Sequence, residues 1–222
     1  MSSFNQYIIY HDDDIIMVEK PSLLLSVPGR GIEKLDSVTT RLQALFNEVH
    51  IVHRLDWETS GLMVFAKNKS SQKALNIQFM NRLVKKQYQA IIFGHLQGKG
   101  FIDFPLIADW ERRPKQKVDY HRGKQSLTYW ELIAQGKTKN KNISHIRLSP
   151  VTGRSHQLRV HLAALSHPIL GDPLYAQPMA VQMANRLQLH ASFLSFSHPR
   201  TDKKISFKST CPFSLSDFDN LD

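Results

Sequence analysis

Cysteine is almost absent from this chain: Cys211 is the only one among 222 residues. A single cysteine excludes an intrachain disulfide and favours a reducing compartment, and we expect a small, partly buried side chain rather than a catalytic thiol. No apolar run approaches the roughly 18 residues that a membrane-spanning helix needs. The first residues lack a basic stretch followed by an apolar core, so no signal peptide is expected. These absences predict a cytoplasmic protein.

The short motifs that bind common cofactors are missing as well. The sequence has no Gly-rich phosphate loop, no dinucleotide fingerprint and no Cys/His metal spacing. His156 and His161 are close in sequence, but positions i and i+5 of a helix do not share one face. We therefore expect neither a cofactor nor a metal ion.

Acidic residues are outnumbered by basic ones, 19 against 29, which gives a formal net charge of +10 and a pI near 9.7. Such an excess favours polyanionic partners, because neutralised phosphates release counterions. A membrane surface would suit the same charge, so composition supports a nucleic-acid partner without deciding it. With 41% hydrophobic residues and no internal repeat or low-complexity linker, residues 1–222 are expected to form one globular domain with its own core.

The hydrophobic patterns predict an α+β fold with a mixed, largely antiparallel sheet flanked by helices. Tyr7–Val18 is expected to form a hairpin around an acidic turn, Ser37 to cap a short helix, and Lys137–Lys141 to be an exposed hairpin tip. The further strands are expected at residues 62–66, 88–93, 128–133, 143–148 and 189–197. The further helices are expected at 70–83, capped by Ser70, at 157–165, and within 173–187.

The most informative segment is Ile51–Leu62, which reads IVHRLDWETSGL. It sets Asp56 two positions after Arg54 and just before a Thr-Ser-Gly turn that leads into the buried strand 62–66. A loop that enters a sheet can hold a reactive group firmly. An isolated Asp in such a place would more often pair with a neighbour such as Arg54 or cap the turn.

The residue pattern of this segment, HRLDxxTSGL, resembles the active-site signature of the RluA family of RNA pseudouridine synthases. Further blocks resemble that family in the expected order: residues 15–21, 86–94, 152–161, 167–172 and 189–199. Residues 27–30 and 113–118, with the short length, resemble the branch that modifies both ribosomal and transfer RNA. Leu23 departs from the pattern, since many relatives have glycine there. The resemblance implies a central sheet with an active-site cleft, and no S4-type RNA-binding domain is expected.

The resemblance also implies three catalytic residues. Asp56 would be the nucleophile that attacks the sugar, or the base that removes a sugar proton; the sequence does not choose. Arg159 matches the arginine that pairs with this Asp, where a cation fixes and charges the carboxylate. Tyr88 matches the tyrosine that stacks on the target base. A surface ion pair for Arg159 and a core position for Tyr88 are the plain alternatives.

Other basic residues are candidates for RNA contacts. The target uridine must leave its stack to be modified, and Arg54 is placed beside Asp56 to brace the gap. Predicted loops contain further cations that could bind phosphates: Arg30, Arg112, Arg113, Lys115 and Lys117. Ordinary surface charges exposed to solvent would give the same sequence pattern. His53 and His190 are expected to be structural hydrogen-bonding residues.

We therefore expect a pseudouridine synthase, an isomerase that acts as a monomer on stem-loops of transfer RNA and large-subunit ribosomal RNA. A synthase for only one of these RNAs is the nearest alternative. An RNA-binding or chaperone protein without catalysis would have no need of Asp56, Tyr88 and Arg159 together. A glycosidase-like hydrolase would need a second carboxylate in a comparable setting, and the sequence offers none.

Overall fold

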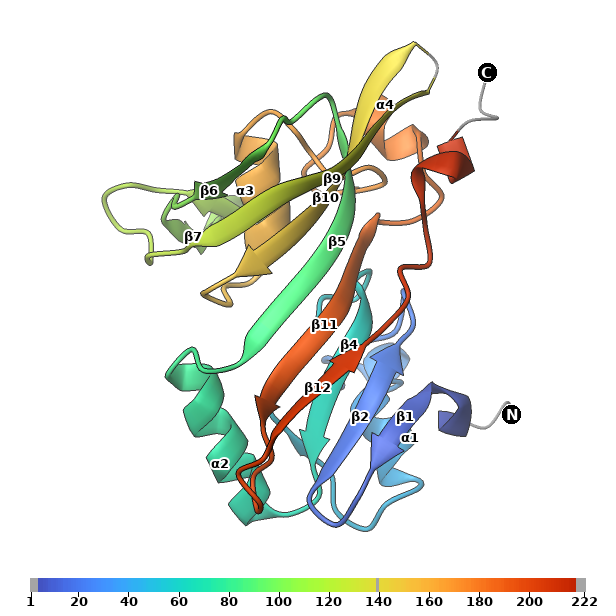
Figure 1. The fold of residues 1–222 in the computed structure, drawn as a ribbon, viewed down its shortest axis with the longest axis vertical. Helices are drawn as coiled ribbons and strands as arrows, with labels where there is room; N and C mark the ends of the chain where they lie inside the picture. The colour runs from blue at the N-terminus through green and yellow to red at the C-terminus, as the bar shows by residue number, and fades with distance from the viewer. Residues whose placement is uncertain (1–3, 139, 219–222) are drawn as a thin grey trace. The chain divides into compact units, whose positions relative to one another are not determined.

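The computed structural model describes residues 4–138 and 140–218, so Lys139 of the expected hairpin tip lies outside the described residues. The chain divides into two compact units (Figure 1). Unit 1 comprises Met1–Lys85 and Ala191–Thr210, and unit 2 comprises Lys86–His190 and Cys211–Asp222. Each unit is therefore assembled from segments that are far apart in the sequence.

Unit 1 is a sheet with strand order β1-β2-β4-β11-β12, and β3 also pairs with β4. Its elements are η1 (Phe4–Tyr7), β1 (Ile8–His11), β2 (Ile15–Lys20), η2 (Ile32–Lys34), α1 (Val38–Gln43), β3 (His50–Ile51), β4 (Ser60–Ala66), α2 (Lys69–Met80), most of β11 (Leu189–Ser197) and β12 (Lys204–Lys208). Helix α2 contributes Leu75 to a buried cluster that β2, β4 and β11 complete with residues such as Met17, Val64 and Phe196. Strand β4 is buried along its whole length, as its apolar sequence predicts.

Unit 2 is built on a sheet with strand order β5-β10-β9-β6 and a separate β7-β8 pair. Its elements are β5 (Lys85–Phe93, all but its first residue), β6 (Lys99–Ile102), β7 (Leu106–Ala108), η3 (Trp110–Arg112), β8 (Gln116–Val118), β9 (Thr128–Thr138), β10 (Lys141–Pro150), α3 (Gln157–Ala164), α4 (Pro178–Gln182) and η4 (Leu215–Phe218). Leu158 and Leu162 of α3 pack on one sheet face, against Ala90 and Leu148. A second cluster around Ile91 and Phe213 includes residues from α4 and η4.

The predicted α+β class is confirmed, with antiparallel pairing within the sheets of both units. The acidic β1–β2 turn and the Ser37 cap with its capping box form as expected. The predicted cap of α2 was wrong: Asn68, not Ser70, precedes the helix and accepts a hydrogen bond from the backbone N–H of Ser71 at 2.8 Å. The implied central cleft stays a prediction.

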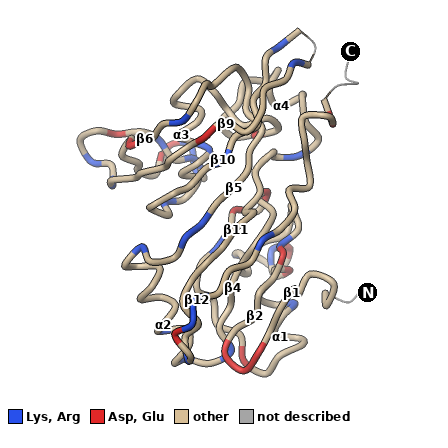
Figure 2. Tube along the Cα trace, viewed as in Figure 1, with Lys and Arg blue, Asp and Glu red and all other residues tan. Residues whose placement is uncertain are grey.

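Lysines and arginines are spread over both units, whereas the β1–β2 turn is acidic (Figure 2). Among residues 4–138 and 140–218, no helix is both long enough and apolar enough to cross a membrane. Cys211 is partly buried, and burial raises the pKa of its thiol to about 11, which fits the expected inert side chain.

Candidate active site

Asp56 lies in a loop of unit 1 whose backbone is fixed on both sides by serine side chains. The Ser26 hydroxyl accepts from the N–H of Leu55 at 3.1 Å and donates to its carbonyl at 2.7 Å. The hydroxyl of Ser22 donates to the carbonyl of Glu58 at 2.6 Å. Asp56 itself is half-buried. These bonds hold the short loop against the segment that follows β2.

A buried lysine ties the same two segments together. The Lys20 side chain is fully buried, and its ammonium donates to the carbonyls of Pro21, Leu24 and Trp57 at 2.8, 2.7 and 3.0 Å. An ammonium has three protons to donate, and a buried charge is tolerated only when such bonds stabilise it. Because Trp57 follows Asp56 directly, Lys20 restrains the backbone that carries the candidate carboxylate.

Gly61 sets how closely this loop approaches its neighbour in unit 1. Its φ is +113°, and a Cβ there would lie 2.3 Å from the carbonyl oxygen of Ala191. Only glycine satisfies both conditions. Thr59 and Ser60 just before it are buried, and the N–H of Thr59 donates to the carbonyl of Asp56 at 3.2 Å. The predicted Thr-Ser-Gly turn is therefore tightly packed, and its Ser60 and Gly61 are already the first residues of β4.

His53 and Arg54, the residues before Asp56, differ in burial. The Nε2 atom of His53 accepts from the backbone N–H of Val64 at 3.1 Å, and its ring stacks on Phe79 with centroids 4.8 Å apart. His53 is thus the structural residue that its sequence context suggested. Arg54 is exposed, as a residue that binds RNA must be. Arg30 is also exposed, in the loop before η2.

In unit 2, Arg159 is buried, which excludes the surface ion pair that the sequence left open. It donates from Nε and Nη2 to the two carboxylate oxygens of Asp172, at 2.8 and 2.7 Å, and both side chains are 1% exposed. Asp172 also accepts from the N–H groups of Leu174 and Tyr175. The Tyr175 ring lies 5.4 Å from the guanidinium carbon. Arg159 is therefore held in one orientation by its surroundings.

Tyr175 connects this buried pair to the basic loop at residues 109–117. Its hydroxyl accepts from the backbone N–H of Gln116 at 2.8 Å and shares a hydrogen bond with Nδ1 of His156 at 2.7 Å. His156 precedes α3 with a φ of +53°, in the left-handed region. The Tyr175 hydroxyl thus links the turn that follows Asp172 to strand β8 and to the residue that precedes α3.

Tyr88 lies on β5, directly opposite Leu148 of β10, so both side chains are on the sheet face that α3 covers. Its ring packs against the cluster around Leu158 and Leu162 but is only partly buried. The Tyr88 ring is therefore held by the core on one side, and part of its surface is accessible to solvent.

The loop at 109–117 presents the other predicted basic residues. Asp109 is buried and pairs with Arg112 at 2.8 Å, which fixes the loop. The exposed guanidinium of Arg113 lies 3.3 Å from the ring centroid of Trp110, which is itself 69% exposed. Lys115 is half-buried, and Lys117 is exposed on β8. This loop offers cations beside an aromatic ring, a combination suited to RNA.

One group of side chains within the described residues has the spacing of metal ligands: Asp12, Asp14 and His198, in unit 1. Arg200 already contacts Asp14 at 2.7 Å, and His198 bonds to Asp12 at 2.9 Å. We read the group as an ion-pair cluster that ties the β1–β2 turn to the turn after β11.

The sequence model of the RNA pseudouridylate synthase family matches residues 14–164, more than half of the chain. The chain belongs to the RNA pseudouridylate synthase family. Enzymes of this family convert uridine in RNA to pseudouridine, and the match contains the Asp56 loop, Tyr88 and Arg159.

Curated pseudouridylate synthases are similar over almost the whole chain. The dual-specificity RNA pseudouridine synthase RluA of Vibrio vulnificus (strain CMCP6) is 51% identical over 208 residues, which cover 93% of this chain and 83% of that protein. The protein of the same name from Escherichia coli (strain K12) is 49% identical over 207 residues and 93% of both chains. Among solved structures, human RNA pseudouridylate synthase domain containing 1 superposes with a TM-score of 0.79 at 29% identity, covering 97% of this chain and 85% of that one.

Sequence reasoning missed two residues of this pseudouridylate synthase that the structure makes prominent. Asp172 was noticed within a family block, but nothing in its spacing linked it to Arg159. Lys20 lies in the family block at 15–21, and only the apolar run before it hints at its burial. Both residues form bonds that depend on segments meeting in three dimensions.

The predicted site residues divide between the two units of the synthase. Arg30, Arg54 and Asp56 belong to unit 1, and Tyr88, Arg113, Lys115, Lys117 and Arg159 belong to unit 2. Within unit 2, Arg159, Asp172 and Tyr175 are brought together. The predicted pairing of Arg159 with Asp56 joins residues of different units and stays a prediction.

Proposed function

We propose that this synthase isomerises uridines in both transfer RNA and large-subunit ribosomal RNA. The observation that carries the proposal is near-50% identity over 93% of the chain to relatives named dual-specificity RNA pseudouridine synthases. An exposed Arg54 beside a rigidly held Asp56 loop supports it, because both RNAs would have to present a flipped uridine to the same residues.

The reaction needs no oxidant, reductant or energy source. The N1–C1′ glycosidic bond breaks, the uracil turns, and a C5–C1′ bond forms. The proton on C5 is lost and N1 gains one, so product and substrate are isomers. The protein therefore has to supply a nucleophile or base, an orientation for the freed base, and a route for one proton.

We assign the catalytic roles to Asp56, Tyr88 and Arg159. Asp56, as a carboxylate, attacks the sugar or removes a sugar proton. Arg159, oriented by Asp172, supplies a fixed positive charge that keeps a carboxylate ionised and aimed. Tyr88 offers a half-packed ring for the uracil to stack on and a hydroxyl near the proton transfer.

RNA binding would fall to the exposed cations. Arg54 braces the gap that the flipped nucleotide leaves, while Arg30, Arg113, Lys115 and Lys117 neutralise phosphates. A net charge of +10 suits this task. We expect a compact stem-loop, such as that of an anticodon, to be recognised largely by shape.

We also propose that the chain works as a single catalytic domain and a monomer in the cytoplasm. Because each unit is assembled from two separated stretches of the chain, neither corresponds to a continuous sequence domain. Sedimentation velocity of the free protein and of its RNA complex would measure the stoichiometry. A single protomer per RNA is expected.

The decisive test is release of tritium from uridine labelled at C5, with transfer RNA and a ribosomal RNA fragment as separate substrates. The wild type should release tritium from both, and Asp56→Asn should release none while still binding RNA. Asp13→Asn is the matched control, because that side chain is 84% exposed and lies in the β1–β2 turn. It should keep full activity.

Each other outcome has a distinct meaning. Release from only one RNA would leave a synthase of single specificity. Full activity of Asp56→Asn would remove Asp56 from the mechanism. Sequencing of pseudouridines in cellular RNA, with and without the gene, would then identify the modified positions.

A further inference from the structure

Two aromatic rings of unit 2 are exposed side by side on the sheet. Phe101 of β6 and Tyr129 of β9 are directly opposite each other in the strand register, and their ring centroids are 6.4 Å apart. Phe101 is 62% exposed and Tyr129 50%. Burying such rings is strongly favourable, so leaving two neighbouring ones open to solvent calls for a function.

The register places both rings on the sheet face opposite the one that α3 covers. Leu148 of β10 is buried in the cluster beneath α3, so Ser149 and Arg147 on either side of it point to the opposite face. Ser149 pairs with Tyr129, and Arg147 pairs with Glu131. Together with Lys99 and Phe101 of β6, these residues form what we call the aromatic-basic face.

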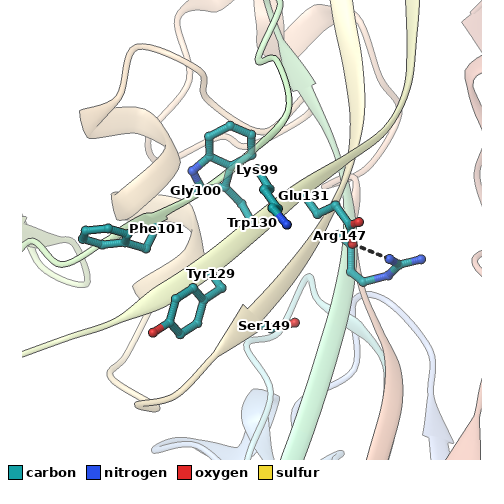
Figure 3. A pocket seen from close by; sticks show the side chains of 8 residues that line it. All are labelled: Lys99, Gly100, Phe101, Tyr129, Trp130, Glu131, Arg147 and Ser149. Carbon is teal, nitrogen blue, oxygen red and sulfur yellow. Dashed lines mark hydrogen bonds and ion pairs between the residues drawn. The ribbon is translucent and has the colours of Figure 1, made fainter.

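A shallow cavity of about 480 Å³ lies at the aromatic-basic face (Figure 3). Its lining also includes Gly100 and Trp130. A Cβ at Gly100 would lie 2.9 Å from the Trp130 ring, so glycine lets the indole pack against the backbone of β6. This volume is within the range of sites that bind small molecules and is large enough for a nucleotide.

Charged groups stand beside the rings. Lys99 is exposed, and Arg147 makes a 2.6 Å ion pair with Glu131 in which both side chains remain about half exposed. An exposed ion pair of this kind contributes little stability, so its cation can be shared with a phosphate at small cost. Rings that stack on bases, next to cations that contact phosphates, are how open sheet faces bind unpaired RNA.

We propose that the aromatic-basic face binds unpaired nucleotides that flank the target stem-loop. A base stacks on Phe101 or Tyr129, and the adjoining phosphates contact Lys99 and Arg147. The face is opposite the one on which Tyr88 lies, so it is an additional contact and not part of the catalytic residues. The proposal requires only an RNA substrate, which family membership establishes, and not a particular RNA.

The first test measures the affinity for a labelled oligouridylate of roughly 10 nucleotides by fluorescence anisotropy. Stacking contributes roughly 5- to 150-fold in affinity per base, so the double variant Phe101→Ala/Tyr129→Ala should bind at least about fivefold more weakly. Phe101→Tyr/Tyr129→Phe, which keeps both rings, should bind like the wild type. Ile133→Ala is the control, because Ile133 is 41% exposed on the same strand but does not line the cavity.

A second measurement does not depend on the aromatic variants folding well. A plot of log affinity against log salt has a negative slope, and Lys99→Gln should make that slope about 0.7 less steep. This is the value for one lost contact with a single-strand phosphate. On a stem-loop with single-stranded flanks, the double alanine variant should raise KM and leave kcat unchanged. Trimming the flanks should abolish that difference.

Unchanged oligouridylate affinity in the double alanine variant would overturn the proposal. So would a change of oligomeric state in sedimentation velocity without loss of RNA affinity, because the face would then be a contact between copies of the chain. A failure of dual specificity would show as missing turnover of one RNA and would leave these binding results unaffected.

Discussion

Asp172 accepts two hydrogen bonds from the guanidinium of Arg159 in a pair of which only 1% of each side chain is exposed. The pair Asp36–Arg41 has the same two-bond geometry, with both distances 2.7 Å, but its side chains are 61% and 39% exposed. The two pairs therefore share the same two-bond geometry, but they differ in burial and in the backbone N–H groups of Leu174 and Tyr175 that Asp172 also accepts from.

Removing the charge of Asp172 should be costly. Asp172→Asn should lower the free energy of unfolding by about 3–5 kcal/mol, because it takes a neutralising charge away from a buried cation. Asp36→Asn should change it by less than about 1 kcal/mol, since solvent screens an exposed pair. Urea denaturation of both variants measures the difference.

If Arg159 acts in catalysis, the folded fraction of Asp172→Asn should also have a lower kcat with little change in KM. Asp172 would then be a positioning residue. Equal destabilisation by the two substitutions, or a normal kcat in folded Asp172→Asn, would contradict this reading.

Lys20→Met should destabilise the Asp56 loop more than the size of the change suggests. The thioether fills similar space, but three carbonyls lose their donor, so we expect about 3 kcal/mol or more of lost stability. Lys73→Met, on the exposed side of α2, should stay within about 0.5 kcal/mol of the wild type. Thermal unfolding checks both. A stable Lys20→Met protein with full activity would show that the loop does not need this anchor.

Gly61→Ala and Gly98→Ala separate a steric clash from backbone strain. Both glycines have positive φ, +113° and +77°, but only Gly61 faces backbone atoms, while a Cβ at Gly98 would meet nothing within 4 Å. Gly98→Ala should cost about 1 kcal/mol from the left-handed backbone alone. Gly61→Ala should cost clearly more or prevent folding, because β4 and the Ala191 backbone must move apart. Similar melting temperatures for the two variants would refute the clash.

Stability should fall as the pH drops below neutrality, with His190 contributing. Burial, and to a lesser extent the positive charge of nearby Arg186, lower the pKa of His190 from an ordinary value of 6.5 to about 4. The unfolded chain therefore takes up a proton between pH 6.5 and pH 4 that the folded chain does not. The stability is fully present above pH 6.5, and about 3 kcal/mol of it is lost by pH 4. His190→Gln should flatten this part of the pH profile in urea denaturation, and an unchanged profile would argue against it.

Leu23→Gly should stabilise the protein slightly, although glycine usually destabilises. Leu23 has a φ of +62° and is 58% exposed, so its side chain loses little packing when removed. Removing the steric strain of a left-handed leucine should raise the free energy of unfolding by roughly 1–2 kcal/mol. The greater chain entropy of glycine in the unfolded state should lower it by about 0.5–1 kcal/mol. A net gain of up to about 1 kcal/mol is expected, and a loss in chemical denaturation would contradict it.

Local patterns in the sequence were enough to locate most strands and helices. The apolar run at 62–66 and the alternation of apolar and polar residues at 143–148 reflect which side chains are buried. They correspond to strands β4 and β10. The cap of α2 was misplaced because Asn68 and Ser70 are both good caps and the choice depends on how the chain leaves β4. The Asp172–Arg159 pair was out of reach, because it exists only once α3 and the following turn have packed together.

The interleaved make-up of the two units has a consequence for how the molecule is made. Strand β4 needs β11 as its neighbour, yet more than 120 residues are translated between them. On the ribosome, β4 must therefore wait with an unpaired edge until β11 has emerged. Such delayed closure slows folding and makes the nascent chain a natural client for chaperones.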